Sequence, residues 1–220
     1  LYARTFMRVL LVQPPRPLWP YINEQDNYLL PQWMVCLGAV LREAGHRVSL
    51  LACMPERVGW RTLEARIRAA RPDMLCTGEN HALFASEVVR LVNLAKAIDP
   101  AMVTVVGGGH FTNTVEHYLP GEPMDFIVRG EGEATLLELA RALESGGLEE
   151  ARTVDGVAFA EDGDVRYTAP RELVEDLDSL PMPAYDLLPL RAYGRARYLF
   201  SPGGVTMHHS RGCTGSCQFC

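Results

Sequence analysis

The chain has 220 residues, of which 48% are hydrophobic and 22% charged, the ordinary balance of a soluble globular protein with one full domain and the beginning of a second. Its formal net charge of −6 and its lack of any Lys/Arg cluster argue against a nucleic-acid-binding surface. No apolar run approaches the ~20 residues that a membrane span needs, and the first residues do not form a signal peptide.

Apolar runs of strand length alternate with helical patterns through the first two thirds of the chain. The predicted strands cover residues 8–13, 47–51, 73–78, 102–106 and 124–128, and the predicted helices cover residues 33–44, 60–71, 84–98, 114–118 and 133–143. This alternation predicts a parallel five-stranded sheet covered on both faces. Right-handed crossovers then favour a doubly wound Rossmann-like or flavodoxin-like fold with strand order 2-1-3-4-5.

Ligands of such folds bind outside the carboxyl ends of the strands, so the loops at residues 13–32, 77–83, 107–113 and 129–133 are the candidate sites. Consecutive glycines at residues 107–109 let the backbone approach a ligand closely, although a glycine-rich turn is common in any α/β fold. The acidic stretch at residues 129–133 is more distinctive. Its simplest interpretation is a tight turn with acidic residues at a helix N-terminus.

The pattern changes from residue 154. Residues 154–159 and 165–167 flank a Gly-containing turn and predict a β-hairpin. The Pro-rich residues 177–186 predict an extended interdomain linker, and residues 203–209 predict the first strand of a second domain. We therefore divide the chain into a Rossmann-like domain (7–147), a hairpin and linker (148–200), and the start of a further, truncated domain (201–220).

The last eight residues carry three cysteines, Cys213, Cys217 and Cys220, spaced Cys-x3-Cys-x2-Cys. Structural zinc normally takes four protein ligands, whereas an iron–sulfur cluster is held by cysteines at such short spacings. A [4Fe-4S] cluster with three cysteine ligands would leave one iron open. A zinc site completed from elsewhere and unrelated cysteines are the alternatives. The other cysteines, Cys36, Cys53 and Cys76, stand singly in apolar stretches and are predicted to be small buried residues in a reducing cytoplasm.

The cysteine spacing, with Phe219 just before the third cysteine, resembles that of the radical S-adenosylmethionine (SAM) superfamily. The rest of the chain resembles the cobalamin-binding domain at the front of the B12-dependent radical SAM family. That resemblance covers nearly the whole chain, and it rests on Pro14-Pro15, residues 37–46, residues 106–110, residues 128–133 and residues 178–186.

The resemblance implies three cofactors, namely cobalamin, SAM and a [4Fe-4S] cluster. Cys213, Cys217 and Cys220 would hold the cluster, with SAM on its open iron. The corrin would lie across the strand ends, with its nucleotide tail near the glycine loop. The cofactor contacts that the resemblance implies are Thr77, Gly78, Gly107, Gly108, Gly109, His110, Gly130, Glu131 and Phe219.

One feature departs from the pattern of other B12 domains, in which a histidine after the first strand ligates cobalt. Residues 13–32 contain no histidine, so His81 and His110 are the histidines left in the strand-end loops of the first domain. Either is a candidate cobalt ligand, although a loop histidine that faces solvent or has protein partners is the simpler interpretation. A domain of this fold that does not bind cobalamin is therefore an open alternative.

The activity that the resemblance implies is radical methylation of an unactivated carbon in a small-molecule or peptide substrate. An electron donor such as flavodoxin or ferredoxin would be a partner. Relatives that cyclise porphyrin esters without oxygen, or rearrange rings, keep other outcomes open. The strands that contact SAM and substrate are expected beyond Cys220, so these 220 residues are not expected to turn over alone. Two non-catalytic alternatives are disfavoured. A response-regulator receiver would need clustered aspartates at the ends of the first and third strands, which this sequence lacks, and a corrinoid carrier would not need the cysteines.

Overall fold

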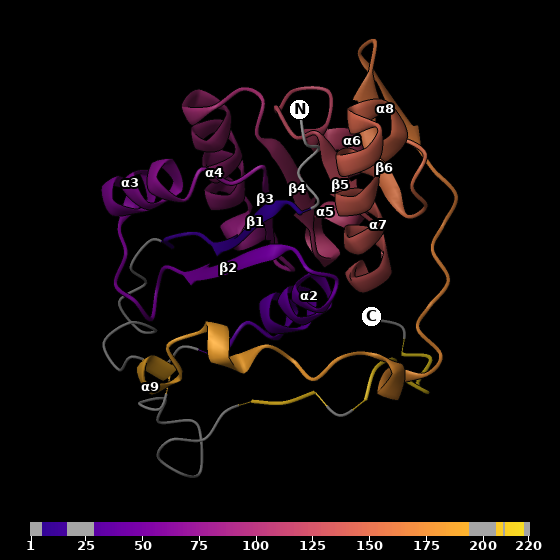
Figure 1. The fold of residues 1–220 in the computed structure, drawn as a ribbon. Helices are drawn as coiled ribbons and strands as arrows, with labels where there is room; N and C mark the ends of the chain where they lie inside the picture. The colour runs from indigo at the N-terminus through magenta and orange to yellow at the C-terminus, as the bar shows by residue number, and fades with distance from the viewer. Residues whose placement is uncertain (1–5, 17–28, 194–205, 209, 218–220) are drawn as a thin grey trace.

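The computed structural model describes residues 6–16, 29–193, 206–208 and 210–217 (Figure 1). Within these ranges the strands form one seven-stranded sheet in the order β2-β1-β3-β4-β5-β6-β7. Its strands are β1 (Arg8–Gln13), β2 (Arg47–Ala52), β3 (Met74–Gly78), β4 (Val103–Gly107), β5 (Phe126–Val128), β6 (Val157–Glu161) and β7 (Asp164–Tyr167). The first five strands are parallel, which confirms the doubly wound arrangement and the order 2-1-3-4-5.

Helices follow the strands as the periodicity predicts, with ends that shift by one or two residues. They are α2 (Gln32–Glu43), α3 (Trp60–Ala70), α4 (Ala85–Ile98), α5 (Gly109–Asn113), α6 (Val115–Tyr118), α7 (Gly132–Ser145), α8 (Gly147–Ala151) and α9 (Leu190–Tyr193). The helix predicted over residues 114–118 is preceded by a second short one, α5. Thr114 separates the two, because its backbone leaves the helical region at φ −133° and its hydroxyl donates to the His110 carbonyl at 2.6 Å.

Both faces of the sheet are buried, as the apolar runs predict for parallel strands. On β1, Val9 and Leu11 face the helices α2 and α7, whereas Leu10 and Val12 face α3 and α4. The helices α5 and α6 complete the second face beside α4. Figure 1 shows α2 and α7 on one side of the strands and α3 and α4 on the other. None of the helices in the described part of the chain is long and apolar enough to cross a membrane.

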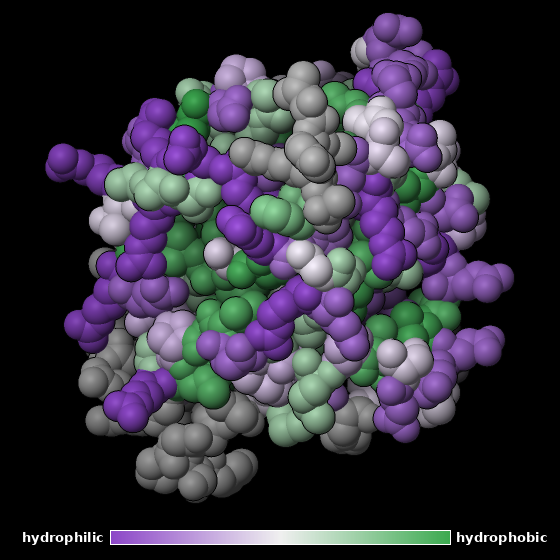
Figure 2. All heavy atoms as spheres, viewed as in Figure 1, coloured by the Kyte–Doolittle hydropathy of each residue, from purple (hydrophilic) through white to green (hydrophobic). Residues whose placement is uncertain are grey.

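The predicted hairpin is present after α8, and it continues the sheet, which therefore has seven strands where five were predicted. β6 pairs antiparallel with β5, with Ile127 opposite Ala158, and β7 pairs with β6. The Phe159 ring packs against the Phe126 ring at 6.1 Å between centroids, so the hairpin extends the core over β5. The projecting tip of the hairpin is hydrophilic (Figure 2), which suits its exposed Glu-Asp-Gly-Asp turn.

The predicted linker lies against the first domain along α2 (Figure 1). The Ala184 amide donates to the Val35 carbonyl at 2.9 Å, and the Arg42 guanidinium pairs with the Asp186 carboxylate at 2.6 Å. Residues 206–208 follow the linker and are not in a strand, although a strand is predicted over 203–209; the other residues of that prediction lie outside the described ranges. The Thr206 carbonyl accepts a hydrogen bond from the Gln32 side chain, where a strand would need a backbone partner.

Candidate functional site

The carboxyl ends of β3 and β4 lie side by side, with Gly78 paired to Gly107. The loops that follow them are hydrogen-bonded to each other. The Glu79 amide donates to the Gly107 carbonyl at 3.1 Å, and the Gly109 amide donates to the Asn80 side-chain oxygen at 2.8 Å. The two glycine-containing loops that the sequence singles out therefore form one connected surface at the edge of the sheet.

Two of these glycines are required by the packing of the loops. A Cβ atom on Gly78 would lie 2.6 Å from the Gly107 carbonyl oxygen, and one on Gly108 would lie 2.6 Å from the Glu79 carbonyl oxygen. Gly108 also has a φ of +93°, which disfavours any side chain. Gly107 and Gly109 are different, because their Cβ atoms would find no described atom closer than 3.9 and 3.7 Å. Their missing side chains leave space that the described residues do not fill.

Thr77 contributes a buried polar group at the same edge. The residue is 3% exposed, and its hydroxyl oxygen has no hydrogen-bond partner among the described residues. A buried hydroxyl without a partner costs about 1–3 kcal/mol, so it is a natural contact for a polar group of a ligand. The open positions at Gly107 and Gly109 leave room at this edge for a large ligand with polar groups along its edge, as a corrin with its nucleotide tail is.

A charged pair that the sequence did not point to holds two of the site loops together. The Arg16 guanidinium, after β1, pairs with the Glu79 carboxylate, after β3, and lies over the Phe84 ring at 4.1 Å. The other Glu79 oxygen accepts from the Asn80 and His81 amides at 2.9 and 3.3 Å. An acid and a base in neighbouring strand-end loops are the one signal in the sequence that could have indicated this pair.

The two candidate histidines differ in their surroundings. The His110 Nε2 atom lies 2.9 Å from the Tyr118 hydroxyl, and the His110 ring makes an edge contact with the Phe111 ring. His81 is exposed at the surface of the loop after β3. The described residues include no group of three or more side chains placed to hold a metal ion. Cobalt ligation by either histidine stays a prediction.

The loop after β5 holds an arginine from the other end of the chain. Gly130 turns the backbone with φ +83°, and Glu131 and Glu133 follow at the start of α7. The Arg211 guanidinium pairs with Glu131 at 3.0 Å and with Glu133 at 2.5 Å. Burial alone would raise the pKa of Glu131, but hydrogen bonds from the Val174 amide and from Arg211 lower it overall.

The cysteine loop begins two residues after Arg211. Cys213 and Cys217 are exposed, and the Gly215 amide donates to the Cys213 sulfur at 3.3 Å. A Cβ atom on Gly215 would lie 3.4 Å from the Cys213 sulfur and 3.6 Å from the Cys217 sulfur, so both thiols face the same point. The other predicted residues of this loop, Phe219 and Cys220, lie outside the described residues.

Two of the three isolated cysteines, Cys53 and Cys76, are buried as the sequence predicts, and Cys36 is not fully buried. Cys53 and Cys76 are buried, and burial raises the pKa of both thiols, for Cys53 to about 12. Cys36 is partly exposed on α2, and burial raises the pKa of its thiol as well. Thiols of this kind are poor metal ligands and nucleophiles at neutral pH, which leaves Cys213 and Cys217 as the exposed thiols among the described cysteines.

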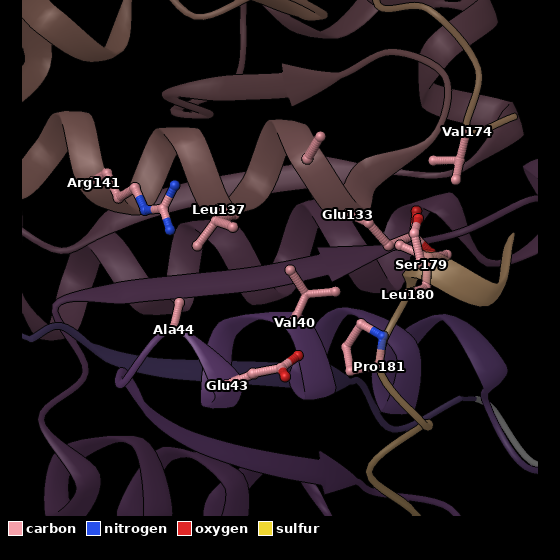
Figure 3. Close-up of a pocket in the computed structure, with 11 residues that line it drawn as sticks. Val40, Glu43, Ala44, Glu133, Leu137, Arg141, Val174, Ser179, Leu180 and Pro181 are labelled. Atoms are coloured by element: carbon pink, nitrogen blue, oxygen red, sulfur yellow. The ribbon is translucent and has the colours of Figure 1, made fainter. Parts of the chain in front are cut away.

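A cavity of about 470 Å³ lies on the outer side of α2 and α7 (Figure 3). It is lined by Val40 of α2, Leu137 of α7 and the linker residues Val174 and Leu180. Among the residues that the structure describes, none of the predicted cofactor contacts lines this cavity, and neither do the glycines at the strand ends. Glu133 is the lining residue that lies at the carboxyl edge of the sheet. We therefore do not include it in the candidate site.

The model of the B12 binding domain family matches residues 19–140 of this chain. Several proteins are similar over nearly all of it. An uncharacterized methyltransferase of Pyrococcus horikoshii is 34% identical over 97% of this chain and 45% of its own length. An anaerobic magnesium-protoporphyrin IX monomethyl ester cyclase of Synechocystis is 33% identical over 97% of this chain and 42% of its own. The chain thus spans less than half the length of these curated relatives.

Solved structures share the fold. OxsB, a cobalamin-dependent SAM radical enzyme solved with aqua-cobalamin and SAM bound, aligns with a TM-score of 0.74 and 22% identity over 98% of this chain and 28% of its own. TsrM, a radical SAM methyltransferase from Kitasatospora setae solved with cobalamin and a [4Fe-4S] cluster, aligns with a TM-score of 0.61 and 20% identity over 83% of this chain and 32% of its own. At these identities the likeness is one of fold.

Proposed function

Because this chain belongs to the B12-binding domain family, we propose that it is the N-terminal part of a B12-dependent radical SAM enzyme. In this proposal the domain binds cobalamin at the carboxyl edge of its sheet. The terminal loop holds a [4Fe-4S] cluster through Cys213, Cys217 and Cys220, and SAM occupies the open iron. The reaction is the methylation of an unactivated carbon. The proposed partner that reduces the cluster is an electron donor such as flavodoxin or ferredoxin.

The main observation that supports the proposal is that the two candidate cofactor regions lie at the same edge of the sheet. The glycine surface and the Thr77 hydroxyl lie at the ends of β3 and β4. Arg211, two residues before Cys213, is bound to the loop after β5, the next strand of the same edge. A reaction that needs a radical and a methyl group on one substrate requires both sources to be close together.

The residues of the chain suit the roles that this proposal gives them. Bound cobalamin supplies a transferable methyl group, and SAM on the cluster supplies the radical that opens the substrate C–H bond. Gly107 and Gly109 leave room for a ligand, and the Thr77 hydroxyl offers it a hydrogen bond. Gly215 leaves the space between the sulfurs of Cys213 and Cys217 free of a side chain.

Cyclisation is the second candidate reaction, and the cyclase of Synechocystis at 33% identity favours it. The two outcomes share the cofactors and differ in the fate of the methyl group. Incubation of the complete enzyme with SAM labelled in its methyl group separates them. Label in the product supports methylation, whereas a product that gains a ring and no label supports cyclisation.

The binding part of the proposal is tested on this chain. We would reconstitute it anaerobically with hydroxocobalamin, iron and sulfide, desalt it, and record the UV–visible spectrum. We expect corrin bands near one equivalent, in the base-off form, together with bound iron. A C213S/C217S variant should lose the iron and keep the corrin. Loss of the corrin from the parent chain would contradict cobalamin binding, and iron retained by the variant would contradict the assignment of the cysteines.

A further inference from the structure

Arg211 is held by two carboxylates that belong to a different part of the chain. Its two terminal nitrogens bind separately, one to Glu131 at 3.0 Å and the other to Glu133 at 2.5 Å. The Glu133 side chain is 8% exposed and that of Glu131 is 18% exposed, so the two carboxylates are largely shielded from solvent, whereas the Arg211 side chain is 31% exposed. A planar guanidinium with a fixed fork of donors suits such a pair of acceptors, and a lysine would not.

The position of the two carboxylates explains why they need a cation. Glu131 immediately precedes α7 and Glu133 lies in its first turn, where the helix dipole favours negative charge. Two shielded carboxylates so close together repel each other unless a positive group lies between them. The second Glu131 oxygen accepts from the Val174 amide at 2.6 Å, which ties the linker to the same point. Glu133, Val174 and Ser179 line the same cavity (Figure 3).

A second contact, at Thr206, holds the chain shortly before Arg211. The Gln32 side chain, at the start of α2, donates to the Thr206 carbonyl, and its oxygen accepts from the Tyr185 hydroxyl at 3.2 Å. Both α2 and α7 begin at the carboxyl edge of the sheet, so Thr206 and Arg211 are both attached to that edge. Two residues of extended chain span at most about 7 Å, so the backbone of Cys213 cannot lie far from that of Arg211.

We propose that Glu131, Glu133 and Arg211 form a clamp that sets the position of the cysteine loop relative to the cobalamin-binding edge. Arg211 is then a positioning residue, and Glu131 acts through it and not through direct contact with the corrin. The clamp deepens the proposed function and rests on it for its purpose. Its existence is a property of the protein without cofactors, so it is tested without them.

The test measures a distance distribution in the cofactor-free chain. A nitroxide on Cys213, with Cys217 and Cys220 replaced by serine, is paired with a nitroxide on an S145C variant at the exposed end of α7. Cys53 and Cys76 are buried and Cys36 is partly shielded with a raised thiol pKa, so Cys213 and the cysteine introduced at position 145 are labelled preferentially. Double electron–electron resonance should give one narrow distribution in the parent.

An E131Q/E133Q variant and an R211Q variant attack the clamp from its two sides. We expect both to broaden the distribution to the range of an untethered segment, and R211K to broaden it less. D186N is the matched control, because it removes the Arg42–Asp186 ion pair between α2 and the linker and leaves the clamp intact. Circular dichroism and a melting curve verify that each variant is folded.

The outcomes separate this proposal from the proposed function. A distribution that stays narrow in both clamp variants overturns the clamp, whatever the cofactor content of the protein. A D186N variant that broadens as much as the clamp variants also overturns it, since the linker would then set the position. In the complete enzyme, clamp variants that retain cobalamin and cluster but lose turnover would support the positioning role. Clamp variants that lose the corrin would assign Glu131 to the cofactor instead.

Discussion

The glycines of the loop after β4 allow a test that separates folding from ligand binding. We predict that Gly107→Ala leaves the fold intact and weakens cobalamin binding, whereas Gly108→Ala destabilises the protein itself. The added methyl at Gly107 has no described neighbour within 3.9 Å, but it occupies the space beside the strand end that the proposed ligand would use. At Gly108 the same methyl would lie 2.6 Å from the Glu79 carbonyl oxygen.

The structure gives the magnitudes. A side chain at the φ of +93° of Gly108 costs about 1–2 kcal/mol, and separating the two loops to relieve the contact loses a hydrogen bond worth about 1 kcal/mol. The total of about 2–3 kcal/mol corresponds to a fall in melting temperature of roughly 5–10 °C for a chain of this size. Gly107→Ala should instead be neutral or stabilising by up to about 1 kcal/mol, because alanine restricts the unfolded chain.

Two measurements on each variant decide the matter. Thermal unfolding of the cofactor-free protein reports stability, and titration with hydroxocobalamin followed by desalting reports corrin retention. We expect Gly107→Ala to lose at least about tenfold in affinity, or about 1.4 kcal/mol, at unchanged stability. Full corrin retention by Gly107→Ala would refute the placement of the ligand at this loop, and an unchanged melting temperature for Gly108→Ala would refute the packing argument.

Three further predictions concern stability and pH. Burial holds the pKa of His46 below its usual value of 6.5, so as the pH falls the unfolded chain takes up a proton at a higher pH than the folded protein does. The free energy of unfolding should therefore rise with pH up to about 6.5. His46→Asn should flatten that rise in urea titrations at several pH values. The Asp125 carboxylate accepts from Lys96 at 2.5 Å and from β4, so Asp125→Ala should cost about 2–3 kcal/mol in urea unfolding and Asp125→Asn less. The pKa of Glu131 is lowered, so its pairing with Arg211 should persist above pH 4.5 and weaken as the pH falls through the lowered pKa. The spin-label distance distribution of the parent should then broaden with falling pH, whereas that of E131Q should not change with pH.

Much of the fold follows from local pattern. Residues 8–13 form β1 within the predicted bounds. The run is apolar, which favours a strand buried on both faces, and the two prolines after it end the strand. The alternation of such runs with amphipathic helices is enough to predict the parallel order, since right-handed crossovers leave few topologies. The spacing of the terminal cysteines belongs to the same class of signal, since their separation along the chain is what limits the ligands they can share.

The arrangement of the site follows from contacts that the linear sequence does not contain. Arg211 meets Glu131 across 80 positions, and Arg16 meets Glu79 across 63, so neither pair has a local signature. The unpartnered Thr77 hydroxyl and the difference between Gly107 and Gly108 depend on which atoms surround them after packing. The hairpin joins the sheet for the same reason, because the short β5 becomes an edge that β6 can cover only once the parallel strands are assembled. Local propensity sets the elements, and the path of the chain between them sets which side chains meet.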